Sequence, residues 1–167
     1  MGPLADFLAE DHRRLDTLLD SALADPDKVD GAAYDRFRAG LLRHIGMEEK
    51  ILLPAAQRLR GGEPLPIAVK LRLDHGALAA LLMPTPTTVI LAKIRGILAD
   101  HNALEEGGDG LYEVCDRLAG AEAERLLAAF RAAPEVNVMA HSDSPAVMNA
   151  VRRSLERAGY AGLENCQ

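Results

Sequence analysis

Apolar residues recur every three or four positions along almost the whole chain, and this spacing is the strongest constraint on its fold. Four long segments carry the pattern: residues 3–24, 31–60, 66–83 and 86 to about 106. Their apolar seams consist of Leu4, Leu8, Leu15, Leu19 and Ala22; Tyr34, Phe37, Leu41, Leu52, Ala55 and Leu59; Ala68, Leu71, Leu78 and Leu82; and Ile90, Ile94 and Ile97. Because long amphipathic helices with short connections pack side by side, we predict an all-α fold based on an antiparallel up-down four-helix bundle.

The helical pattern is interrupted at residues 107–110, which read GGDG. Glycine costs about 1 kcal/mol relative to alanine inside a helix, so we expect a kink or a break there. Helical spacing then resumes in a short fifth helix, and after Pro134 the stretch EVNVMAHSDS is irregular or extended. Ser144 before Pro145 marks the start of a capped last helix. We therefore divide the chain into a bundle with its short fifth helix, residues 1–133, and a C-terminal appendage, residues 134–167.

Composition excludes several classes of partner. The chain of 167 residues has a net charge of −6, only 4% aromatic residues and no Trp, so neither nucleic acid nor an anionic membrane is an expected partner. No apolar run approaches the roughly 20 residues that span a bilayer, and the start MGPLADFLAEDH lacks the pattern of a secretory signal. We expect a cytoplasmic protein in which Cys115 and Cys166 are free thiols.

Polar residues inside the apolar seams indicate the function. Each long segment has one histidine in its seam, and two of the four are followed at i+4 by a glutamate: His12, His44 with Glu48, His75, and His101 with Glu105. A single such histidine is more often a hydrogen-bonded core residue, and HxxxE alone is a weak motif. Burying all of them together without compensation would cost more than the stability of a small domain. The set therefore predicts a metal site.

The four histidines and two glutamates divide into two equivalent halves. The first two helices supply a histidine and an HxxxE pair, and the next two helices supply the same set. Two such halves facing one another would hold two metal ions, each bound by two imidazoles and both linked by two bridging carboxylates. Imidazole and carboxylate ligands suit iron, with manganese or zinc as alternatives. Exogenous oxygen ligands would complete the coordination.

Four stretches of the chain resemble the hemerythrin-like family, also called the HHE cation-binding domain: DHRRLDTLL, HIGMEEKILLPA, LDHGALAALL and DHNALEEGGDGLY. The resemblance covers residues 1 to about 133 and implies a four-helix bundle with a non-haem di-iron centre, bridged by an oxo or hydroxo group and two carboxylates. It implies a protein that binds or senses dioxygen, nitric oxide, iron or redox state, and we favour this function over an enzyme. The alternatives are a di-iron oxidase or peroxidase, an iron donor for cluster repair, and a structural metal bundle that contacts other proteins.

The chain departs from the dioxygen carriers of this family at two places. Those carriers have a second histidine one turn along the third helix, where this chain has Ala79, with Leu71 one turn the other way. One metal would therefore have one imidazole ligand fewer than in the carriers, and this disfavours reversible dioxygen carriage. The carriers also place an aspartate five residues after the last histidine, where this chain has Glu106. We favour Glu105 as the ligand because it repeats the i+4 spacing of the first HxxxE pair, although a π-bulge near GGDG would present Glu106 instead.

Several other polar residues have two interpretations. Glu49 either binds a metal itself or, as we favour, supports a metal ligand or faces solvent. His141 either completes or gates the site or, as we favour, lies on a surface loop. Tyr34 and Tyr112 either hydrogen-bond a bridging oxygen or pack in the core. Cys115 is either a redox thiol near the metals or, as we favour, a buried structural residue.

Overall fold

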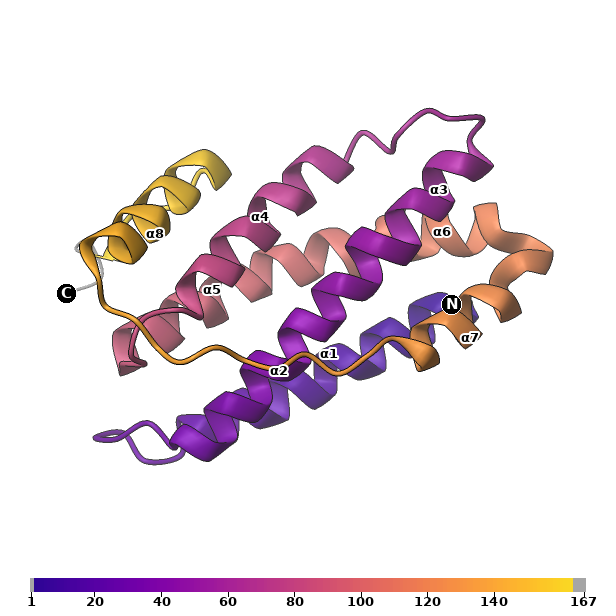
Figure 1. Cartoon of the computed structure of the whole chain (residues 1–167). Helices are drawn as coiled ribbons and strands as arrows, with labels where there is room; N and C mark the ends of the chain where they lie inside the picture. The colour runs from indigo at the N-terminus through magenta and orange to yellow at the C-terminus, as the bar shows by residue number, and fades with distance from the viewer. Residues whose placement is uncertain (1, 164–167) are drawn as a thin grey trace.

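The computed structural model describes residues 2–163, and within this range the chain is helical with no strand. The elements are α1 (Pro3–Ala22), α2 (Gly31–Met47), the π-helical turn η1 (Glu48–Leu52), α3 (Leu53–Leu59), α4 (Ala68–Leu81), α5 (Thr88–Glu106), α6 (Leu111–Ala119), the 3-10 turn η2 (Gly120–Glu122), α7 (Ala123–Ala132) and α8 (Pro145–Ala158) (Figure 1). The predicted all-α class is confirmed. None of these helices has the length and apolar character needed to cross a membrane.

The long helices begin and end close to the positions predicted from the seams. The four predicted segments correspond to α1, to α2 through α3, to α4 and to α5. Their first and last residues differ from those of the helices by at most two positions. The break at GGDG is confirmed, because α5 ends at Glu106 and α6 begins at Leu111. Gly110 permits this tight turn, since a Cβ there would lie 2.7 Å from each of three backbone carbonyl oxygens. Beyond the turn, α6 continues in roughly the direction of α5 and lies beside the start of α1 (Figure 1).

A π-helical turn occurs at the first HxxxE pair, not at the second. The alternative of a π-bulge beside GGDG is wrong, because α5 remains α-helical through Glu106. The π turn, Glu48–Leu52, lies just before Pro54. A proline inside a helix has no N–H to donate and its ring clashes with the carbonyl four residues earlier, here that of Lys50, so the helix widens upstream of it. The widened turn carries both Glu48 and Glu49.

The apolar core is divided by a layer of polar side chains. One cluster, the Leu8 cluster, includes Leu4, Leu8, Met47, Leu52, Leu71, Tyr112 and Phe130. The other, the Leu15 cluster, includes Leu15, Leu19, Phe37, Leu41, Leu78, Ile94 and Ile97. On α1, α2 and α4 the seam passes from one cluster to the other across a buried polar position, such as His12 between Leu8 and Leu15. Helix α5 packs in the Leu15 cluster up to Leu98, and beyond His101 and Glu105 the Leu8 cluster resumes at Leu111 on α6. Apolar packing on both sides thus holds the polar layer in the middle of the bundle.

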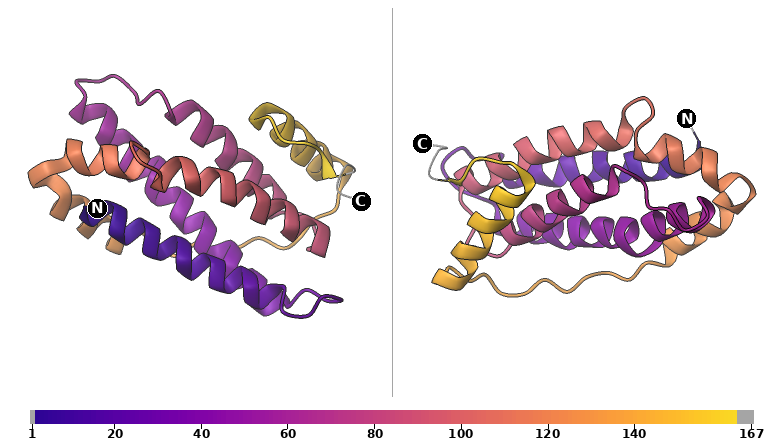
Figure 2. Two further views of the ribbon diagram at one scale, coloured as in Figure 1. Left: turned by 180° about the vertical axis from the view of Figure 1, so that it is seen from behind. Right: turned by 90° about the horizontal axis from the view of Figure 1, so that it is seen from above.

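The segment between α7 and α8 is irregular and crosses the bundle alongside α2, as Figures 1 and 2 show. Arg38 donates a hydrogen bond to the Met139 carbonyl at 2.8 Å, and the Ser142 amide donates to the Met83 carbonyl at 2.9 Å. Helix α8, capped by the Ser144 hydroxyl as predicted, packs on α4. The division at residue 133 stays a prediction, and Cys166 lies outside the described residues.

Candidate metal centre

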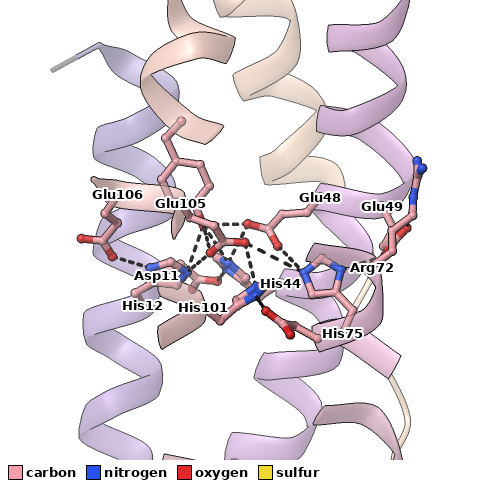
Figure 3. A network of polar contacts seen from close by, with 12 residues as sticks. Asp11, His12, His44, Glu48, Glu49, Arg72, His75, His101, Glu105 and Glu106 are labelled. Atoms are coloured by element: carbon pink, nitrogen blue, oxygen red, sulfur yellow. Dashed lines mark hydrogen bonds and ion pairs between the residues drawn. The ribbon is translucent and has the colours of Figure 1, made fainter. Parts of the chain in front are cut away.

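All six side chains predicted as metal ligands converge in the polar layer, where they point toward one another (Figure 3). They form two groups that share both glutamates: His12, His44, Glu48 and Glu105 in the first group, and His75, His101, Glu48 and Glu105 in the second. Within each group the possible ligand atoms lie within 4.8 Å of one another. Every member is buried, and Glu48 and Glu105 have no exposed surface.

Each shared glutamate turns one oxygen toward each group. Glu48 places Oε1 3.3 Å from Nε2 of His44 and Oε2 3.0 Å from Nε2 of His75. Glu105 places Oε2 3.2 Å from Nε2 of His12 and Oε1 2.8 Å from Nε2 of His101. This is the arrangement that two carboxylates need to link a pair of cations.

Each histidine is held from behind by a carboxylate at Nδ1. The pairs are His12 with Glu106, His44 with Asp11 at 2.8 Å, His75 with Glu49 at 2.7 Å, and His101 with Asp74 at 3.0 Å. When Nδ1–H donates to a carboxylate, Nε2 is left as the atom that faces inward, and the ring cannot rotate freely. A neutral imidazole in this state presents its lone pair to the centre, as a metal ligand must.

The supporting carboxylates follow the same pattern in both halves. An aspartate directly before a histidine holds the other histidine of the same half: Asp11 on α1 holds His44, and Asp74 on α4 holds His101. The glutamate after each shared glutamate holds a histidine of the opposite half, and this explains Glu49 and Glu106. Sequence reasoning missed Asp11, Asp74 and the role of Glu106, although the repeated Asp-His and Glu-Glu pairs were the available signal.

Glu105 is the inward glutamate of its pair, as the i+4 spacing predicts. Its side chain is fully buried, whereas the Glu106 side chain is 35% exposed and reaches only Nδ1 of His12.

Asp74 is in turn fixed by Lys70, whose ammonium group donates to Asp74 Oδ1 and to the Ala158 carbonyl, both at 2.7 Å. The end of α8 is therefore connected through two side chains to the polar layer.

The buried charges shift one another's pKa values strongly. Burial by itself lowers the pKa of His44, but the Glu48 and Asp11 carboxylates outweigh it and raise the pKa to about 10. Burial also lowers the pKa of His101, and Asp74 and Glu105 raise it to about 10. Burial raises the pKa of Glu48, yet the nearby His44 and His75 hold it well below its usual value. Glu48 thus remains charged and attracts positive charge, which protons on His44 and His101 supply when no metal does.

Three buried atoms of the second group lie close to one another or to His101 but make no hydrogen bond of good geometry in the described part of the chain: Glu48 Oε2, His75 Nε2 and Glu105 Oε1. His75 Nε2 lies 3.0 Å from Glu48 Oε2 and 3.9 Å from Glu105 Oε1. Leaving such atoms unsatisfied costs about 1–3 kcal/mol each, and more when they are charged. A cation among them would satisfy all three, so the residues present fit a metal ion.

A small cavity adjoins the centre on the side of the Leu15 cluster. Its volume is about 10 Å³, and its lining includes His12, His44, Glu48, His101, Leu15, Leu41, Leu78 and Leu98. A cavity of this size accommodates roughly one water-sized molecule. It gives a small ligand space beside the polar layer.

The other candidate residues lie outside both groups. His141 contacts α2, with its Nε2 3.9 Å from Asp35 Oδ1 and its ring stacked on Tyr34 at 6.2 Å between centroids. Tyr34 packs in the core, as the second interpretation of it predicts. Burial, with help from Asp116 and Glu48, raises the pKa of Cys115 to about 12, so its thiol stays protonated and unreactive at neutral pH. Tyr112, by contrast, reaches the first group.

Replacing Asp11 by Asn is expected to weaken metal binding in the first group by about 10- to 100-fold, and Asp74→Asn should do the same in the second. The amide is neutral and no longer increases the basicity of the imidazole that it holds. Anaerobic titration of the metal-free protein with ferrous iron would measure each affinity. Asp100→Asn is the matched control, because Asp100 also precedes a histidine but is exposed. Equal losses in all three variants would contradict the assignment.

Comparison with protein-family models finds a match over most of the bundle. The family model described as the hemerythrin HHE cation binding domain matches residues 4–110. This range contains all six converging side chains and ends before α6, α7 and α8. Comparison with curated proteins and with solved structures found no match.

Proposed function

The chain belongs to the hemerythrin HHE cation binding family, and from this premise we propose that it binds two iron ions and takes up a small diatomic ligand, dioxygen or nitric oxide. In this proposal His12 and His44 hold one ion, His75 and His101 hold the other, and Glu48 and Glu105 bridge them. The four long helical segments form an antiparallel four-helix bundle around the two ions, and these segments are α1, α2 continued by α3, α4, and α5.

The observation that carries this proposal is the position of the two shared carboxylates. Each directs one oxygen to each pair of imidazoles, and the four imidazoles are held by carboxylates at their outer nitrogens. A donor set of imidazole and carboxylate without a thiolate suits iron. Both sets of donors are already arranged by the apolar packing on either side, so little reorganisation is needed on binding.

The diatomic ligand is favoured by the surroundings of the centre. Ferrous iron supplies the affinity for dioxygen or nitric oxide when it is bound there. The residues of the chain provide the space and the exclusion of water: the cavity of about 10 Å³ lies against His12, His44 and His101, and leucines form much of its remaining wall. An oxidase acting on an organic molecule would need a larger opening. The size of this cavity therefore supports binding or sensing over that alternative.

The experiment is anaerobic reconstitution with ferrous iron, followed by metal analysis and rapid mixing with dioxygen or nitric oxide. We expect two iron ions per chain and an absorption band that persists after mixing, whereas zinc-loaded protein should give no band. Rapid one-way conversion to the ferric state would instead identify an oxidase. A single bound metal ion per chain would overturn the dinuclear proposal.

A further inference from the structure

We propose that the hydroxyl oxygen of Tyr112 is a fifth protein ligand of the iron held by His12 and His44, and that the two iron positions are therefore unequal. This inference rests on the proposed function, because it concerns the same centre. Tyr112 lies on α6, beyond the residues matched by the family model.

The position of the hydroxyl is the first argument. Its oxygen lies 2.6 Å from Glu48 Oε1, 2.9 Å from His12 Nε2, 3.0 Å from Glu105 Oε2 and 3.2 Å from His44 Nε2. These are the inward atoms of all four members of the first group. A hydroxyl carries one proton and can donate to only one of them. Two of these four atoms are carboxylate oxygens, of Glu48 and Glu105, and they carry negative charge. A cation beside the Tyr112 oxygen would neutralise that charge.

The second group differs in this respect. Three of its inward atoms, on Glu48, His75 and Glu105, make no hydrogen bond of good geometry with residues 2–163. The Tyr112 hydroxyl contacts the other oxygen of each glutamate, the one that faces the first group. The phenol therefore belongs to one position only, although the histidines and carboxylates repeat in both halves.

The fold holds the phenol in this position. Tyr112 is the second residue of α6 and is 1% exposed. Farther along α6, the Asp116 carboxylate accepts hydrogen bonds from the Leu4 and Ala5 amides at 2.9 and 3.0 Å, which fixes α6 on the start of α1. The tight turn at Gly110 fixes its other end. Because contacts at both ends of α6 hold this helix in place, the phenol ring stays beside the first group. Its oxygen therefore needs only a small shift to coordinate an ion.

A tyrosine ligand makes the two positions chemically different. When the phenol binds ferric iron, its proton is released to the solvent, as is usual for a protein ligand that binds a metal. The added negative charge stabilises the ferric state of the first ion. The second ion keeps only four protein ligands, and α4 has Ala79 one turn beyond His75. The two positions would thus differ in the number of their protein ligands and in their charge.

The test uses the full-length protein loaded with ferric iron, with iron counted per chain. We expect a visible phenolate-to-iron charge-transfer band, with tyrosine ring modes enhanced in the resonance Raman spectrum. Tyr112→Phe should lose both signals and keep two iron ions, whereas the control Tyr34→Phe should keep both signals. Wild-type protein containing ring-deuterated tyrosine should show shifted ring modes, and this measurement does not depend on the folding of any variant.

The outcomes separate the two proposals. If wild-type protein binds two iron ions but shows no tyrosine modes, or if Tyr112→Phe retains them, the ligand assignment is wrong while the dinuclear centre stands. If wild-type protein binds no iron, both proposals fall.

Discussion

Glu48→Gln is expected to lower the iron content from two ions per chain to one or none. The substitution keeps the shape of the side chain but removes its charge, and it replaces one of two acceptor oxygens with an NH₂ donor. Because the two oxygens of Glu48 face different histidine pairs, the amide must present its donor to one of them. A fully buried side chain has no room to turn toward solvent and avoid this. Metal analysis after reconstitution would give the stoichiometry directly.

The control for this experiment is His141→Ala, because His141 lies outside both groups. It should retain two iron ions per chain, with the magnetic coupling expected of a bridged pair. Two coupled ions in Glu48→Gln would remove the bridging role of this carboxylate. Loss of iron in His141→Ala would show that the segment after α7 contributes to the centre.

The helices and the inward-facing histidines and glutamates could be predicted because both depend on spacing along one helix. His12 falls between Leu8 and Leu15, so the helical repeat alone directs it to the core. The choice of Glu105 over Glu106 follows from the same repeat, since only the i+4 position shares the face of His101. These inferences need no knowledge of how neighbouring helices are placed.

The supporting groups could not be derived in this way, because they depend on the placement of one helix against another. Asp11 holds a histidine on α2, and Glu106 holds one on α1. The pairing is set by the relative height and rotation of the helices, which apolar seams define only loosely. Tyr112 reaches the centre because α5 breaks at GGDG and α6 is set against the start of α1. A glycine-rich break indicates that a turn exists but not its direction.

The metal-free protein is expected to lose stability as the pH rises from about 7 to 9.5, and iron loading should reduce this loss. His44 and His101 have pKa values raised to about 10, against an ordinary value of 6.5. Between these two values the folded protein holds a proton that the unfolded chain has released, so the free energy of unfolding falls with pH. The stabilisation is complete below pH 6.5 and is lost as the pH passes 10. The slope is roughly 1 kcal/mol per pH unit for each histidine.

The direction of this effect follows from the groups that surround each ring. Those facing His44 are Asp11 and His12 on α1, Glu48 in η1, Glu105 on α5 and Tyr112 on α6. Those facing His101 are Asp74 and His75 on α4, Glu48, and Glu105 on its own helix. Carboxylates dominate both sets, so deprotonating the imidazoles leaves buried negative charge without compensation.

Denaturant unfolding of the metal-free and iron-loaded forms, measured side by side across this pH range, tests the prediction. Surface groups titrate alike in both forms, so the difference between the two curves isolates the centre. Bound iron takes over the positive charge that protons otherwise supply, and it keeps that charge when the pH rises. The two curves should therefore separate toward alkaline pH. Parallel curves would mean that the polar layer does not exchange protons for metal, and the case for a cation site there would fail.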